Sequence, residues 1–144
     1  METTDGALSL ETMIQRKEYA LARDSDANSA THSTLKASLL SLQILSRLKE
    51  YRAPDSALFW VPVDLNSVRG YREKISTPID LGTIASEVFA DKYGADLELF
   101  KKRVTLVWDN CKKFNAGRTL AHFAAEYVVR INRIIVLALN YTCL

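Results

Sequence analysis

The sequence predicts an all-α fold in which four helices form a bundle and one long loop joins the first two. Apolar side chains recur at spacings of three and four residues in several segments, which is the pattern of a helix with one buried face. The chain of 144 residues has only five glycines and three prolines, too few for the many tight turns of a β-sandwich or barrel. With 48% hydrophobic residues, it can bury one core.

The first 30 residues are mostly polar and small, and we expect an extension that is weakly ordered or forms a short helix over residues 8–21. The first bundle helix is predicted from Thr34 and should end before Pro54, because proline disfavours helical geometry in the residue before it. Its apolar face consists of Leu35, Leu39, Leu42, Leu45 and Leu48. We therefore divide the chain into an extension, residues 1–30, and one domain, residues 31–144.

Residues 53–78 follow neither a helical nor a strand period, and they are far longer than the usual connection between helices. They are too apolar for a solvated linker, so we expect this long loop to fold back over the helices. Long ordered loops are often functional. Asp80 can then accept hydrogen bonds from the first backbone N–H groups of a helix that starts at Leu81, with Ile84 and Val88 on its buried side.

The next helix has the strongest pattern in the chain. Its apolar residues are separated by three, four, three, four and three positions: Leu97, Phe100, Val104, Val107, Cys111 and Phe114. After Asn115-Ala116-Gly117, a final helix is predicted from about Thr119 to Ala138. Its apolar face consists of Leu120, Phe123, Ala124, Tyr127, Ile131, Ile134 and Ala138.

Composition disfavours several functional classes. The 19 basic and 17 acidic side chains nearly balance, so nothing demands a nucleic-acid ligand. Cys111 and Cys143 are too few for a disulfide framework and have no partner at metal-ligand spacing, so we expect a reducing compartment and no metal. We find no signal peptide or membrane-spanning stretch, and we expect a soluble intracellular protein. No phosphate loop, activated nucleophile or cofactor motif occurs, so we expect no enzyme and no cofactor.

A series of short motifs lies between Phe59 and Asn115. The motifs are Pro62-Val63-Asp64, Tyr71 seven residues before Pro78, Thr77-Pro78-Ile79-Asp80-Leu81 followed by Thr83-Ile84, the aromatics Tyr93 and Phe100, and Asn110-Cys111-Lys112-Lys113-Phe114-Asn115. With Ala125-Glu126, they resemble in order and separation the motifs of the bromodomain family. The resemblance covers about residues 33–138. It implies a left-handed four-helix bundle that recognises acetyl-lysine.

The sequence departs from the family pattern at positions around the expected pocket. Ala57-Leu58-Phe59 followed by Trp60 stands where the family often has Trp-Pro-Phe, and Val68-Arg69-Gly70 replaces a proline-containing approach to the loop tyrosine. Phe114 replaces a tyrosine and lacks its hydroxyl. Ala121 stands where a larger side chain is usual, which implies a wider entrance to the pocket.

The resemblance assigns roles to individual residues. Asn115 would donate its amide NH2 to the acetyl carbonyl, and Tyr71 would hold a water molecule that bridges to the same oxygen. The other expected acetyl-lysine-binding residues are Val63, Phe59, Val68, Phe114, Pro62, Cys111 and Ala121. Unmodified lysine would be rejected because burying an unpaired ammonium costs several kcal/mol. One neutral hydrogen bond returns only about 1 kcal/mol net, which is too little to compensate.

Simpler structural roles remain open for the same residues. Asn115 could be a helix C-terminal residue with left-handed geometry before Gly117, and Tyr71 could belong to the core under the loop. For Trp60 we favour a core role. For Asn110 we favour hydrogen bonds that hold the loop to the helices.

Two functional hypotheses follow from the resemblance. In the first, the chain binds acetylated lysine peptides, with histone tails as the expected source, and recruits an attached protein or complex to chromatin in the nucleus. Other chromatin proteins would then be partners, and no sequence-specific nucleic acid or membrane would be bound. In the second, the chain is a bromodomain-like scaffold for protein partners that has lost acetyl-lysine binding.

Overall fold

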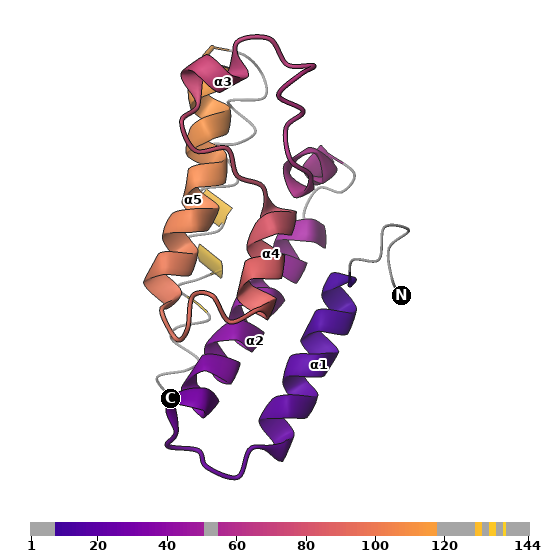
Figure 1. Ribbon diagram of the computed structural model, residues 1–144, viewed down its shortest axis with the longest axis vertical. Helices are drawn as coiled ribbons and strands as arrows, with labels where there is room; N and C mark the ends of the chain where they lie inside the picture. The colour runs from indigo at the N-terminus through magenta and orange to yellow at the C-terminus, as the bar shows by residue number, and fades with distance from the viewer. Residues whose placement is uncertain (1–7, 51–54, 118–128, 131–132, 135–136, 138–144) are drawn as a thin grey trace.

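The computed structural model describes residues 8–50, 55–117, 129–130, 133–134 and 137. In chain order its elements are α1 (Leu10–Arg23), α2 (Ala30–Glu50), the 3-10 helix η1 (Asp55–Trp60), α3 (Tyr71–Lys74), α4 (Leu81–Phe89) and α5 (Leu97–Phe114). Figure 1 shows their arrangement. These residues form helices and contain no β-strand, so the predicted all-α class is confirmed for the described part of the chain.

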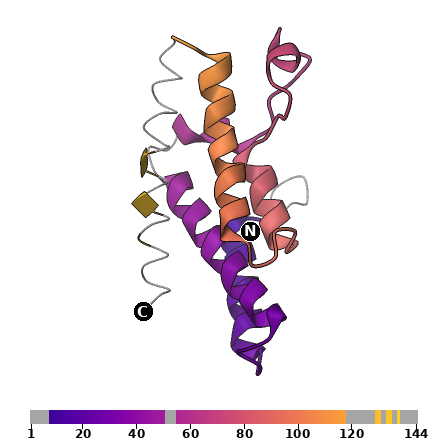
Figure 2. The same cartoon turned by 90° about the vertical axis from the view of Figure 1, so that its left-hand side faces the viewer.

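Three helices of the predicted bundle pack against one another: α2, α4 and α5 (Figures 1 and 2). Their largest fully buried side chains are Trp108, Phe100, Leu42, Leu45, Leu48, Leu81, Ile84 and Val104. Most of the apolar residues expected on these helices therefore belong to one core. The exceptions are partly buried and lie outside it: Leu35, Leu39, Leu97 and Phe114. Trp108, which the sequence analysis did not single out, is fully buried in the core and makes an edge-to-face contact with Phe59, with ring centroids 4.8 Å apart.

The N-terminal segment forms a 14-residue helix, α1, where the sequence allowed either weak order or a short helix. Ser9 caps it by accepting a hydrogen bond from the backbone N–H of Thr12 at 3.2 Å. The helix lies beside α2 (Figure 1), and its Met13 is buried in the common core. The buried Lys17 also reaches the turn that follows α4, where its Nζ donates to Oδ1 of Asp91 at 2.8 Å.

The first turn of α4 fits closely against η1. As predicted, Asp80 begins this helix: its carboxylate accepts from the backbone N–H of Thr83 at 2.8 Å and from the Thr83 hydroxyl at 2.7 Å. A Cβ atom added to Gly82 would lie only 2.4 Å from the carbonyl oxygen of Trp60. Only glycine allows this approach, so the backbone of η1 can lie directly on α4.

The last predicted helix falls largely outside the described residues. The residues of this segment that the structure describes are helical, namely Val129, Arg130, Arg133, Ile134 and Leu137. Ile134 is partly buried and packs against the core, as its place on the expected apolar face predicts. Most of that face, and Ala121 near its start, lie outside the described part of the chain.

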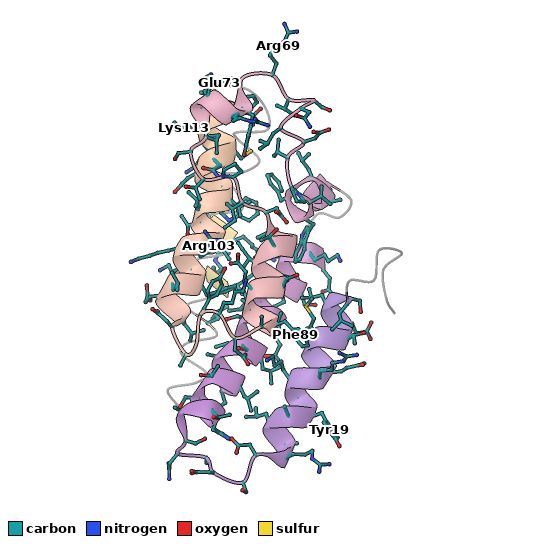
Figure 3. The ribbon with its side chains drawn as sticks, viewed as in Figure 1. Tyr19, Arg69, Glu73, Phe89, Arg103 and Lys113 are labelled. Carbon is teal, nitrogen blue, oxygen red and sulfur yellow. The ribbon has the colours of Figure 1, made fainter. Side chains whose placement is uncertain are left out.

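A polar network joins α4 to α5 on the side of the bundle where Figure 3 labels Arg103. The Arg103 guanidinium lies 3.2 Å from Oε2 of Glu87 and donates from Nε to the Tyr93 hydroxyl at 3.3 Å. Tyr93 in turn donates to Glu87. Burial opposes ionisation of Glu87, but the hydrogen bonds from Tyr93 and Arg103 outweigh it and lower the pKa of Glu87. Burial and Glu87 raise the pKa of Tyr93 to about 12.

We expect the Gly82→Ala substitution to destabilise the fold by about 1–3 kcal/mol, because either η1 or α4 must shift to admit the methyl group. Urea unfolding followed by circular dichroism measures this change. Ser86→Ala, at an exposed position one turn later in α4, is the control and should stay within about 0.5 kcal/mol of the parent. Equal stability of the Gly82→Ala variant and the parent would contradict the close approach.

Stability should depend on the ionisation of Glu87. Because its pKa is below the ordinary value of 4.5 in the folded chain, the carboxylate stabilises the fold above pH 4.5. This contribution is lost as the pH falls through the folded pKa. Unfolding free energies of Glu87→Gln should therefore fall less between pH 5 and pH 3 than those of the parent, by up to about 1 kcal/mol because the group is partly screened by solvent. The exposed Glu73→Gln should behave like the parent.

Candidate functional site

The long loop lies at the end of the bundle formed by the C-terminal end of α5 (Figures 1 and 2). A tight turn shapes its middle: the backbone carbonyl of Asp64 accepts from the N–H groups of Ser67 at 3.1 Å and Val68 at 3.0 Å. Gly70 follows with φ of 83°, a left-handed conformation that glycine adopts without strain. This residue precedes α3, which packs against α5 and begins with the buried Tyr71. The loop therefore returns to the bundle, as expected.

A cavity of about 340 Å³ lies between this loop and α5. Eight of the nine predicted site residues line it: Phe59, Pro62, Val63, Val68, Tyr71, Cys111, Phe114 and Asn115. The ninth, Ala121, lies outside the described residues. The described structure thus brings together side chains from η1, the loop, α3 and the last turn of α5, although their role in ligand binding stays a prediction.

Tyr71 and Phe114 form an aromatic wall of the cavity. Their ring centroids are 4.9 Å apart and the planes meet at 62°, an edge-to-face contact. Burial, with a smaller effect from Cys111, raises the pKa of Tyr71, and burial also raises the pKa of the Cys111 thiol. Both groups are therefore neutral at physiological pH. A cavity with these walls suits a neutral ligand.

Asn115 places an amide group in this mostly apolar lining. It ends α5 with φ of −105°, so the hypothesis of left-handed geometry at Asn115 is wrong; Gly117, with φ of 78°, has that conformation instead. The Asn115 Nδ2 donates to the Cys111 carbonyl at 3.0 Å. The same Nδ2 lies 3.8 Å from the Cys111 Sγ. Sulfur is a weak acceptor, so the second N–H of the amide can donate to a stronger acceptor.

Asn110 has the structural role that its position in the sequence suggested. Its buried Nδ2 donates to the backbone carbonyl of Thr77 at 2.8 Å, which ties the end of the long loop to α5. It does not line the cavity. The core role favoured for Trp60 also agrees with the structure, because Trp60 is partly buried against the core and Lys49 Nζ lies 5.1 Å from its ring centroid.

Six residues of the lining were not predicted as site residues: Leu58, Val61, Asp64, Ile79, Asp80 and Val107. Val107 lies on the apolar face of α5, so the helical period contained its signal. Three others belong to motifs that the sequence analysis recognised, but they were not themselves predicted to bind acetyl-lysine: Asp64, Ile79 and Asp80. Leu58 and Val61 are 56% and 58% exposed and form an apolar lip. Leu58 belongs to the Ala57-Leu58-Phe59 departure from the family pattern, whereas the sequence shows no separate signal for Val61.

Comparison with known proteins identifies the family. The family model named Bromodomain matches residues 42–127 of the chain, which include α4, α5 and the whole long loop. The chain belongs to the bromodomain family. Bromodomains are non-catalytic modules that generally read acetyl-lysine on histones and other chromatin proteins. The motif resemblance and the helical fold are thereby confirmed at the level of the family.

Several curated relatives contain a similar segment. Histone acetyltransferase GCN5 of Oryza sativa subsp. japonica is 29% identical over 111 residues, 76% of this chain and 21% of that protein. Human bromodomain adjacent to zinc finger domain protein 2B is 37% identical over 76 residues, 53% of this chain and 3% of that protein. Bromodomain and PHD finger-containing protein 3 of Mus musculus is 34% identical over 96 residues, 65% and 8% respectively. The chain spans about a fifth or less of each relative.

Two further observations hold for the described residues. Within them, no helix combines the length and apolarity needed to cross a membrane. No three or more His, Cys, Asp and Glu side chains in that part of the chain are grouped so that they could hold a metal ion.

Replacing Asn110 by alanine should destabilise the bromodomain by about 1–3 kcal/mol, because the Thr77 carbonyl loses its buried donor. Thermal and urea unfolding measure the change. Asn66→Ala removes an exposed loop asparagine and serves as the control, with an expected effect below about 0.5 kcal/mol. If both variants were as stable as the parent, the hydrogen bond would not be what holds the loop.

Proposed function

We propose that the cavity binds the side chain of an acetylated lysine and that Asn115 donates a hydrogen bond to the acetyl carbonyl. The observation that carries this proposal is the position of one amide side chain in a cavity with aromatic and aliphatic walls. An acetylated lysine has matching chemistry: a long apolar stem that ends in a neutral amide. Family membership supports the same assignment.

Apart from the exposed Asp64, the remaining polar groups of the cavity support a neutral ligand. The protonated hydroxyl of Tyr71 can hold a water molecule that bridges to the acetyl oxygen. Asp80 is buried, and its carboxylate is occupied by the backbone and hydroxyl of Thr83. It is therefore poorly placed to pair with an incoming ammonium. An unmodified lysine would lose its hydration without compensation, at a cost of several kcal/mol, on the order of a thousandfold in affinity.

The affinity of one acetylated peptide should be modest. A partly open cavity and one direct hydrogen bond correspond to dissociation constants of roughly micromolar to millimolar. Stronger attachment to chromatin would come from a second module or a second mark on the same partner. In this proposal the chain docks on acetylated histone tails or other chromatin proteins, in the nucleus, and brings an attached protein or complex with it.

Isothermal titration and NMR chemical shifts with a panel of acetylated histone peptides test the proposal. The parent should bind at least one acetylated peptide and none of the unmodified counterparts. Asn115→Ala should weaken binding at least about tenfold, because the acetyl carbonyl would be buried without its donor. Folding should change little, since the backbone N–H of Asn115 still donates to the Cys111 carbonyl.

Asn66→Ala is the matched control for binding, since Asn66 is an exposed asparagine of the long loop that does not line the cavity. It should bind like the parent. If no acetylated peptide perturbs the cavity residues, or if Asn115→Ala binds as tightly as the parent, the alternative of a scaffold without acetyl-lysine binding takes its place.

A further inference from the structure

Asp64 places a carboxylate at the mouth of the cavity. Two carboxylates, Asp64 and Asp80, belong to the described lining, and they differ in environment. Asp80 is 5% exposed and caps α4, whereas Asp64 is an exposed residue of the long loop. A ligand that fills the cavity therefore passes close to one solvent-facing anion.

The Asp64 carboxylate is held in a defined position. Its Oδ2 accepts from the Ser67 hydroxyl at 2.5 Å and its Oδ1 from the backbone N–H of Asn66 at 3.0 Å. The same residue anchors the turn through its backbone carbonyl, which accepts from Ser67 and Val68. A group fixed by its own loop loses little conformational freedom when a ligand binds to it.

The charge of Asp64 is also available. The hydrogen bond from Ser67, followed by that from the Asn66 N–H, lowers the pKa of Asp64, so it is ionised at physiological pH. Among the described residues, no lysine or arginine forms an ion pair with it. Arg69, in the same loop, points away from the loop and from the rest of the molecule (Figure 3).

We propose that Asp64 binds the ammonium or guanidinium of an unmodified lysine or arginine that lies near the acetylated lysine in the same peptide. The proposal rests on the acetyl-lysine function and deepens it by naming the class of peptide. The cation would lie outside the cavity, because its interior suits only a neutral amide. Consecutive Cα atoms are about 3.8 Å apart and these side chains are long and flexible, so a nearby position in the peptide can reach the carboxylate.

This arrangement makes Asp64 sensitive to the pattern of acetylation. Acetylation of the neighbouring lysine removes its charge and its interaction with the carboxylate. Asp64 therefore favours a peptide with one acetylated lysine beside an unmodified basic residue over a peptide in which both lysines are acetylated. The cavity accepts a lysine whose charge acetylation has removed, and Asp64 binds a nearby basic side chain that keeps its charge.

A pair of peptides tests the assignment. Both contain one acetyl-lysine in a neutral background; one also carries a lysine, moved in turn through the three positions on either side, and the other has norleucine there. At low salt the parent should bind the best lysine peptide about two- to fivefold more tightly than its norleucine partner. The preference should shrink in 0.5 M NaCl, because salt screens an exposed pair.

Asp64→Asn should abolish this preference, so that the ratio of the affinities for the lysine and norleucine peptides falls to about one. This ratio is the readout, because the Asp64 carboxylate also orders the loop and its replacement can change the affinity for both peptides alike. Glu73→Gln is the matched control: Glu73 is exposed on the neighbouring α3 and lies outside the cavity lining, so the preference should persist (Figure 3).

Three results would overturn the assignment of Asp64. They are a parent without preference at any position, a preference that survives in Asp64→Asn, and an equal loss in Glu73→Gln, which would indicate only a general negative field. The norleucine peptide separates the two proposals. If the parent binds it without preferring lysine, only the Asp64 assignment fails; if the parent binds neither peptide, the acetyl-lysine function fails as well.

Discussion

The close approach of the Trp60 carbonyl to Gly82 is the constraint on which the site depends. It seats one end of the long loop on α4, because no side chain at residue 82 separates the two backbones. The other end is fixed by the hydrogen bond from Asn110 to Thr77, which joins the loop to α5. The cavity-lining loop residues lie between these two attachments. Their positions are therefore limited at both ends by contacts that lie outside the cavity.

The side chains that line the cavity also explain how a neutral ligand is selected. The core presents Phe59, Val107 and Cys111 to the cavity, and the loop adds aliphatic side chains, so an ammonium would find little compensation there. Each polar group in the described interior has a neutral form or a local partner. Tyr71 and Cys111 are protonated because burial raises their pKa values, and Asp80 is used by the first turn of α4. Selectivity would thus arise mainly because the described interior of the cavity has no group that compensates the ammonium of an unmodified lysine for its lost hydration.

The sequence predicted what depends on local pattern. The start of α4 at Asp80, the buried face of α5 and the role of Asn110 were all recognisable, because a cap, a helical period or a family motif marks each of them. The close contact between Gly82 and the Trp60 carbonyl could not be recognised from the sequence, because the two residues are 22 positions apart in the chain. The contact between α1 and Asp91 is equally non-local. Asp64 was recognised within a motif, but the exposure that leaves its carboxylate accessible to a ligand depends on how the loop folds.

The loop lacks the proline expected before Tyr71, and its order has another source. A proline would restrict the backbone of one residue. Here Asp64 holds three residues: its carboxylate accepts from Asn66 and Ser67, and its backbone carbonyl accepts from Ser67 and Val68. Gly70 then allows the sharp change of direction into α3. A proline orders a loop without adding charge. Because a carboxylate orders this one, the same residue that shapes the mouth of the cavity also gives it a fixed negative charge.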